Sequence, residues 1–175
     1  MADWKKQQAE PEPAKMGSAS PLDPFSQQRA MEKMREEQNL VMGFIGGLVA
    51  AVIAAAIWAG VTIVTQYQIS WMAIGVGFVV GFAVRTLGKG VDWTFGVMGA
   101  GLSLLACLLG NLAFAANLAA QEFELPIMEV VTILFQQPEA VIELMTATFA
   151  PMDLLFYGLA LFFGFRASIN EAAKV

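Results

Sequence analysis

Four apolar segments dominate the pattern of hydrophobic and polar positions along this chain. They lie near residues 40–65, 71–87, 94–118 and 151–167. The chain has no charged residue from Gln38 to Val84 and none from Trp93 to Gln121. Because a helix needs about 20 apolar residues to cross the hydrocarbon core of a bilayer, the first uncharged stretch has room for two spans and the second for one. The pattern therefore predicts an all-α integral membrane protein with four transmembrane helices.

Small residues recur every four positions in the first two segments. They are Gly43, Gly47, Ala51, Ala55 and Ala59 in the first segment, and Ala73, Gly77 and Gly81 in the second. Residues four apart share one face of a helix, and helices in a bilayer associate largely through close backbone approach. We therefore expect the two small-residue faces to pack against each other as a tight hairpin. Residues 40–118 would form a three-helix membrane core rich in Gly and Ala.

The remaining parts of the chain differ in composition from this core. The polar composition of residues 1–22 predicts a flexible cytoplasmic tail. Residues 23–39 predict a juxtamembrane helix that continues into the first span, because Asp-Pro at its start is typical of a helix N-terminus. Residues 119–150 predict two short amphipathic helices at the outer surface, since each is too short to cross a bilayer. Residues 151–175 would hold the fourth span and a short cytoplasmic tail.

Basic residues fall on a single side of the membrane if the four segments cross it in order. The ten are Lys5, Lys6, Lys15, Arg29, Lys33, Arg35, Arg85, Lys89, Arg166 and Lys174. Because basic residues near short loops stay on the cytoplasmic side, this asymmetry predicts that both termini are cytoplasmic. Arg166 and Lys174 are also the main support for the fourth span, whose apolar run Leu154–Phe165 is only about 18 Å long as a helix.

The charged and reactive residues of the chain exclude several classes of function. A formal net charge of −5 excludes a nucleic-acid partner, which requires a basic surface. The chain has no histidine, the commonest metal ligand and general base, and its single cysteine, Cys107, excludes a multi-cysteine metal site. Proton-coupled transporters usually place charged residues in the interior of their spans, and here Arg85, Asp153 and Arg166 all lie near the ends of the predicted spans. We therefore expect no catalytic residue, no cofactor and no metal site, and we predict that the protein is not an enzyme.

Two sets of polar residues have more than one interpretation. Ser103 and Asn111 lie inside the third segment and are expected to hydrogen-bond another helix. Together with Thr62, Thr65 and Asn117 they offer an alternative, the lining of a pore. The acidic residues of the outer segment are Glu122, Glu124, Glu129, Glu139 and Glu143. They form either an ordinary solvated surface or a surface that attracts cations or a basic partner.

Two short stretches carry a resemblance to known proteins. Residues 67–85 read YQISWMAIGVGFVVGFAVR and residues 153–158 read DLLFYG. Both resemble elements of small uncharacterised bacterial multi-span membrane proteins, and together they cover about a seventh of the chain. The resemblance implies a bacterial cytoplasmic (inner) membrane location, and it implies no activity because none is known for the group.

The sequence leaves several functions open. The first hypothesis is a non-catalytic membrane subunit or scaffold that packs against partner helices in a larger membrane complex. The alternative is a homo-oligomeric channel or small-solute transporter, and a third possibility is a signalling adaptor that uses residues 1–38. The expected partners are the lipid bilayer and either other membrane-protein subunits or copies of the chain itself.

Overall fold

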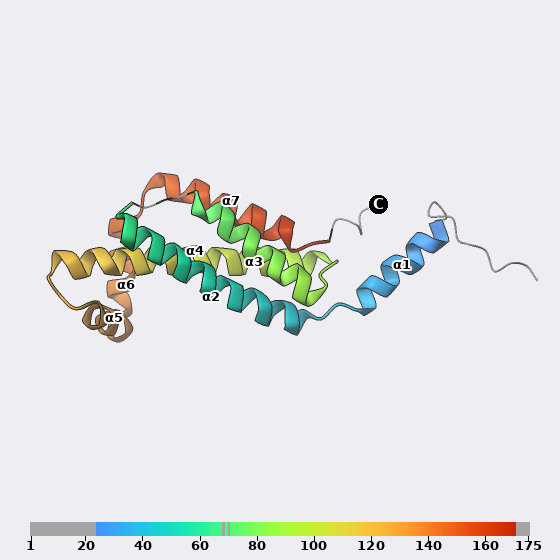
Figure 1. The fold of residues 1–175 in the computed structure, drawn as a ribbon, viewed down its shortest axis with the longest axis horizontal. Coiled ribbons are helices and arrows are strands. Elements are labelled where there is room, and N and C mark those ends of the chain that lie inside the picture. Colours follow the sequence, from blue (N-terminus) through green and yellow to red (C-terminus); the bar gives the residue numbers. More distant parts are fainter. Residues whose placement is uncertain (1–23, 68, 70, 171–175) are drawn as a thin grey trace, which may run out of the picture. The chain divides into compact units, whose positions relative to one another are not determined.

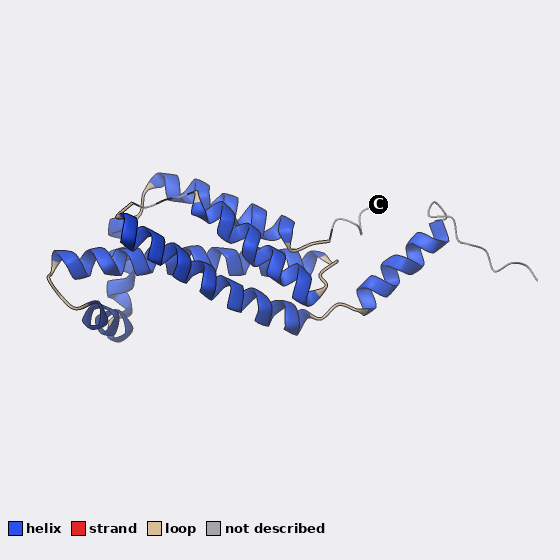
Figure 2. Cartoon of the chain, in the orientation of Figure 1, coloured by secondary structure: helices blue, strands red, loops and turns tan. Residues whose placement is uncertain are grey.

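The computed structural model describes residues 24–67, 69 and 71–170, and every regular element in these ranges is an α-helix (Figure 2). The helices are α1 (Pro24–Glu36), α2 (Leu40–Thr65), α3 (Met72–Gly88), α4 (Trp93–Glu122), α5 (Ile127–Gln136), α6 (Pro138–Thr148) and α7 (Pro151–Ala167). The all-helical prediction is confirmed for this part of the chain. The predicted tail at residues 1–22 and the last five residues lie outside the described ranges.

The chain divides into two compact units after Glu36, and α1 belongs to the first. The prediction of one helix running from residues 23–39 into the first span is wrong, because α1 ends at Glu36 and α2 begins at Leu40. Asn39 has an extended backbone (φ −134°), and its side-chain oxygen accepts a hydrogen bond from the Met42 N–H at 2.9 Å. An asparagine in this role starts a new helix, so Asn39 separates the two helices.

Four helices of the second unit pack along one another (Figure 1). α3 and α4 lie side by side, with α2 against both of them and α7 against both of them on the opposite side. The core between them contains Trp58, Val80, Val84 and Phe95, all of which are fully buried. The long apolar segments of the sequence therefore form a single bundle.

Two helices, α2 with 26 residues and α4 with 30, are long and apolar enough to cross a membrane. The pair α6 and α7, bent by 104° at the break between them, adds a third if the pair is counted as one span. α3 and α7 have 17 residues each, so each is about 25 Å long, whereas the hydrocarbon core is about 30 Å thick. Length and composition thus support two or three spans.

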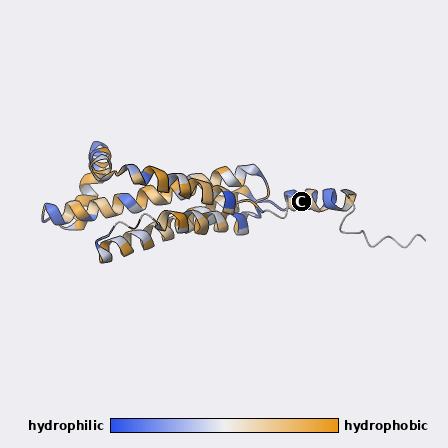
Figure 3. Ribbon diagram, turned by 90° about the horizontal axis from the view of Figure 1, so that it is seen from above, coloured by the Kyte–Doolittle hydropathy of each residue, from blue (hydrophilic) through white to orange (hydrophobic). Residues whose placement is uncertain are grey.

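The outer surface of the bundle is apolar. Side chains of α2 that point away from α3 and α4 are about half exposed, including Val41 (65%), Val49 (54%) and Ile53 (55%). Figure 3 colours the helices of the bundle mostly as hydrophobic. A surface of this size without polar residues is unfavourable in water and fits contact with lipid, so the chain has the character of a membrane protein.

The loop between α3 and α4 is held by residues that flank the first and last helices of the bundle. Gln38 Oε1 accepts hydrogen bonds from the Val91 and Asp92 N–H groups at 3.0 Å each, and Gln38 Nε2 donates to Asp92 Oδ2 at 2.9 Å. The Asn170 N–H donates to the Gly90 carbonyl at 2.9 Å. We call this set of contacts the loop clamp. It brings the start of α2, the α3–α4 loop and the end of α7 to the same end of the bundle.

α5 and α6 pack against the C-terminal part of α4, at the other end of the bundle. Their small core contains Ala116, Ala119, Ala120 and Val130. Val130 is the buried residue of α5 and Leu134 packs against this core, whereas Ile127 is 43% exposed. The residues of α4 in this core are alanines, against which Val130 packs.

Candidate functional site

The small-residue row of α2 lies inside the bundle. Gly43, Gly47, Ala51 and Ala55 are buried, and Ala59 is half-buried. A Cβ atom added at Gly47 would lie 2.4 Å from Cγ2 of Val84 on α3 and 2.6 Å from Cδ1 of Leu102 on α4. The row therefore accepts larger side chains from two neighbouring helices.

The small residues of α3 face a different helix. Ala73, Gly77 and Gly81 are buried. A Cβ added at Gly77 would lie 2.6 Å from the Ala160 carbonyl oxygen of α7, and one at Gly81 would lie 2.6 Å from the Gly164 carbonyl oxygen. The expectation that these residues pack against the small-residue face of α2 is wrong. α2 meets an adjacent face of α3, where the Val84 side chain lies against Gly47 of α2, and α7 covers Gly77 and Gly81.

α4 and α7 cross at a reciprocal pair of glycines and serines. A Cβ added at Gly164 would lie 2.3 Å from Ser103 Oγ and 2.8 Å from the Gly99 carbonyl oxygen. A Cβ added at Gly99 would overlap Ser168 Oγ, at 1.7 Å. Each serine donates to the backbone of its own helix, Ser103 to Gly99 at 2.7 Å and Ser168 to Gly164 at 2.6 Å. We call these four residues the α4–α7 crossing.

The α4–α7 crossing contains two residues, Gly164 and Ser168, that the sequence pattern had not indicated as packing residues. Ser103 was expected to bond another helix, but its hydroxyl bonds within α4 while its side chain packs against Gly164. Ala160, Gly164 and Ser168 form a row with a spacing of four. This spacing is the same signal that was used for α2 and α3, and it could have identified α7 as a packing helix.

Asn111 makes a buried contact with another helix, through Tyr157 of α7. Its amide nitrogen donates to the Tyr157 hydroxyl, and the two residues are 7% and 8% exposed. The Phe149 ring lies beside Tyr157, with 6.4 Å between the ring centroids. The sequence predicted the bond of Asn111 to another helix but not its partner Tyr157, because a tyrosine in an apolar segment has no distinguishing pattern of its own.

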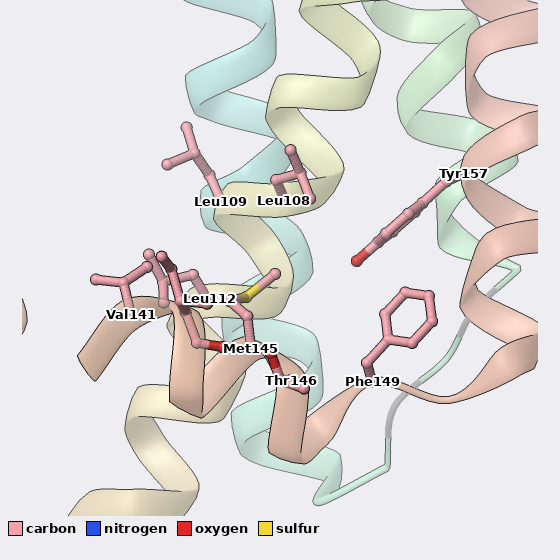
Figure 4. A pocket seen from close by; sticks show the side chains of 9 residues that line it. Leu108, Leu109, Leu112, Val141, Met145, Thr146, Phe149 and Tyr157 are labelled. Carbon is pink, nitrogen blue, oxygen red and sulfur yellow. Dashed lines mark hydrogen bonds between the residues drawn. The ribbon is translucent and has the colours of Figure 1, made fainter. Parts of the chain in front are cut away.

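A cavity of about 540 Å³ opens beside this pair, between α4, α6 and α7 (Figure 4). It is lined by Leu108, Leu109, Leu112, Val141, Ile142, Met145, Thr146, Phe149 and Tyr157. Tyr157 extends from α7 with its hydroxyl directed toward α4, and Leu108 and Met145 lie across the space from it (Figure 4). The walls are otherwise apolar, because Thr146 donates its hydroxyl hydrogen to the Ile142 carbonyl of its own helix at 2.6 Å.

The other hydroxyl groups of the spans bond to nearby backbone. Thr62 Oγ1 donates to the Trp58 carbonyl at 2.9 Å, and Thr65 Oγ1 donates to the Val61 carbonyl at 2.7 Å. Within the described residues, two buried side-chain nitrogens have no hydrogen-bond partner, Trp58 Nε1 and Asn117 Nδ2. The hydroxyl groups among the residues suggested as a pore lining are thus paired with backbone of their own helices.

The acidic residues of the outer segment are all exposed, namely Glu122, Glu124, Glu129, Glu139 and Glu143. Two of them, Glu122 and Glu143, line the same opening of about 500 Å³ between α4, α5 and α6. In the part of the chain that the structure describes, no three acidic or cysteine side chains come together as a group that could hold a metal ion.

The geometry brings together packing contacts, one buried polar pair and an apolar cavity. Tyr157, the member of the buried pair that lines the cavity, can hydrogen-bond to a group there, whereas the α4–α7 crossing brings two helices into close contact. Comparison with protein-family models, with curated proteins and with solved structures finds no match for this chain.

Proposed function

We propose that the protein is a non-catalytic membrane subunit or scaffold that packs against partner helices in a larger membrane complex. The observation that carries this proposal is the use of the polar side chains in the bundle. Thr62, Ser103 and Asn111 bond to backbone or to a neighbouring helix. A hydrogen bond between helices such as Asn111–Tyr157 stabilises their association in a bilayer, whereas the Thr62 and Ser103 hydroxyls are satisfied within their own helices.

The exposed face of α2 is the surface for a partner helix. It carries large apolar side chains, among them Phe44 (48% exposed), Ile45 (50%) and Val52 (54%). Because the small residues of α2 are already covered by α3 and α4, a partner would contact the branched and aromatic side chains instead. The partners are other membrane-protein subunits, or copies of this chain.

The proposed topology has four spans, with both termini in the cytoplasm of a bacterial cell and the protein in its inner membrane. The loop clamp supports it, because the start of α2, the α3–α4 loop and the end of α7 meet at one end of the bundle. That end carries Arg85, Lys89 and Arg166, in agreement with the preference of basic residues for the cytoplasmic side. The resemblance of residues 67–85 to bacterial membrane proteins supports the location.

Reporter fusions test this topology. Fusions after Gln68, Gly90, Gln137 and Val175 are expected to report outside, inside, outside and inside. A reporter that is active only in the periplasm and one that is active only in the cytoplasm should give opposite patterns over the four sites. An outside signal from the Val175 fusion would remove the fourth span.

Purification in a mild detergent tests the role as a subunit. Native mass spectrometry of the purified material is expected to show different membrane proteins bound at a fixed stoichiometry. A homo-oligomer without any other protein would contradict the subunit proposal. Liposomes that contain this homo-oligomer would then be tested for solute flux, and a flux that changes in Asn111→Leu would favour the channel.

A further inference from the structure

The cavity between α4, α6 and α7 is continuous with the apolar surface of the bundle. Leu108 and Leu109 line it from α4, and they are also 37% and 40% exposed on the outside. Both lie in the C-terminal half of α4, a helix that is long enough to cross a membrane, and Tyr157 lies within two turns of the start of α7. In a bilayer, the material in contact with such a surface is lipid hydrocarbon, so the cavity opens to lipid and not to water.

Tyr157 gives this apolar space one hydrogen-bonding group. The Tyr157 hydroxyl accepts a hydrogen bond from Asn111, and a phenol can also donate one. The structure gives this hydroxyl hydrogen no acceptor among the described residues. A buried donor without an acceptor is unfavourable in an apolar environment, and Tyr157 lines the cavity, so an acceptor there would stabilise it.

The size and lining of the cavity define its ligand. Its volume of about 540 Å³ lies within the range of about 300–1,000 Å³ that is usual for small-molecule sites. A ligand that fits has a long apolar part for the leucine, valine and methionine side chains and one oxygen that accepts the Tyr157 hydrogen bond. An acyl chain with its ester carbonyl has both parts, and the surrounding bilayer supplies it.

We propose that this cavity binds one acyl chain of a membrane lipid, with its ester carbonyl oxygen accepting a hydrogen bond from the Tyr157 hydroxyl. The bound lipid fills the space between α4 and the bent pair α6–α7. The site thus differs from the ordinary layer of lipid around the bundle in both its shape and its single polar contact.

Photocrosslinking in vesicles tests occupancy of the cavity. The full chain is reconstituted in phosphatidylcholine vesicles that contain a phospholipid with a photoreactive group in one acyl chain. Crosslinks are expected on residues 108–112 and 141–149. Leu108→Trp should reduce them about fivefold or more because the larger ring fills the cavity. Leu105→Trp is the matched control, since Leu105 is 40% exposed one turn away on α4 and does not line the cavity.

A comparison of ester and ether lipids tests the polar contact. An ether-linked phospholipid has the same chains but lacks the carbonyl acceptor. The wild-type protein should prefer the ester lipid about fivefold in competitive crosslinking, the effect of one hydrogen bond of ordinary strength. Tyr157→Phe keeps the ring and should lose this preference while still crosslinking at the cavity.

Two results would overturn the proposal. The first is equal crosslinking of the wild type, Leu108→Trp and Leu105→Trp, which would mean that the lipid contact is not specific to the cavity. The second is the same ester preference in the wild type and Tyr157→Phe. If Tyr157→Phe fails to elute as a single folded species, Leu108→Trp and Leu105→Trp still test whether the lipid occupies the cavity, and the ester preference of the wild type still tests the polar contact.

Discussion

Glycines in this protein fall into two groups according to what an added methyl group would meet. At Gly164 the added Cβ would collide with Ser103 and Gly99, and at Gly81 it would collide with the backbone of α7. At Gly101 and Gly158 nothing lies within 4 Å. In the first group the lack of a side chain permits the close approach of two helices. In the second group the residue makes no such contact, although it looks the same in the sequence.

This difference predicts opposite effects for two substitutions on α7. Gly164→Ala should destabilise the bundle by about 1–3 kcal/mol because it overfills the α4–α7 crossing. Gly158→Ala, six residues away on the same helix, should change the stability by less than about 0.5 kcal/mol, as at other open sites. Unfolding in mixed detergent micelles, followed by circular dichroism, measures both. Equal effects of the two variants would contradict the crossing described for Gly164.

The ends of the helices are set by individual polar residues. Asn39 caps α2, and α2 and α3 each stop at a residue with left-handed backbone, Gln66 (φ 57°) and Lys89 (φ 50°). The loop after α3 is then fixed by the loop clamp, in which the side chain of Gln38 takes the place of backbone partners for Val91 and Asp92. A residue before the first helix of the bundle thus orders a loop more than fifty residues later.

Removal of this side chain should loosen the α3–α4 loop. Gln38→Ala leaves the N–H groups of Val91 and Asp92 without their acceptor, and their amide hydrogen exchange should become about fivefold to tenfold faster. Gln66→Ala is the control, because Gln66 bonds only to Ile63 at the end of its own helix in the contacts described, at 2.7 Å. Hydrogen exchange of the two variants in detergent, measured by mass spectrometry, should differ only for Gln38→Ala at residues 91–92.

The second compact unit, residues 37–175, consists of a four-helix bundle and the pair α5 and α6, and these two parts differ in how tightly they are packed. α2, α3, α4 and α7 share a core with fully buried side chains such as Trp58 and Phe95. α5 and α6 have a much smaller core against α4, and α6 has no buried residue. Large apolar side chains such as Met128 (70% exposed) and Phe135 (86%) remain uncovered on α5.

Local opening should therefore begin in α5 and α6. Their amides are expected to exchange at least tenfold faster than those in the middle of α4, because few buried contacts are lost when they open. Hydrogen exchange of the protein in lipid bicelles measures this difference. Equal protection of α5, α6 and the middle of α4 would contradict the picture of a weakly attached pair.

The boundaries of the helices followed from the sequence with small errors. The first apolar segment was predicted near residues 40–65 and α2 spans Leu40–Thr65, while the fourth was predicted at 151–167 and α7 spans Pro151–Ala167. Proline, charge and the lengths of apolar runs are local properties of the chain, and they decide where a helix can begin and end. The junction at Asn39 was missed because a single capping side chain competed with a continuous helical pattern.

The sequence by itself determined the helical class, the apolar character of the bundle and the residues able to make close contacts. Only the tertiary structure decided which contacts form: Gly77 and Gly81 meet α7 and not α2, and Asn111 meets Tyr157. The physical reason is that a row of small residues specifies a flat face but not the helix that covers it. That choice depends on how all four helices fill the space between them at once, as does the cavity beside Tyr157.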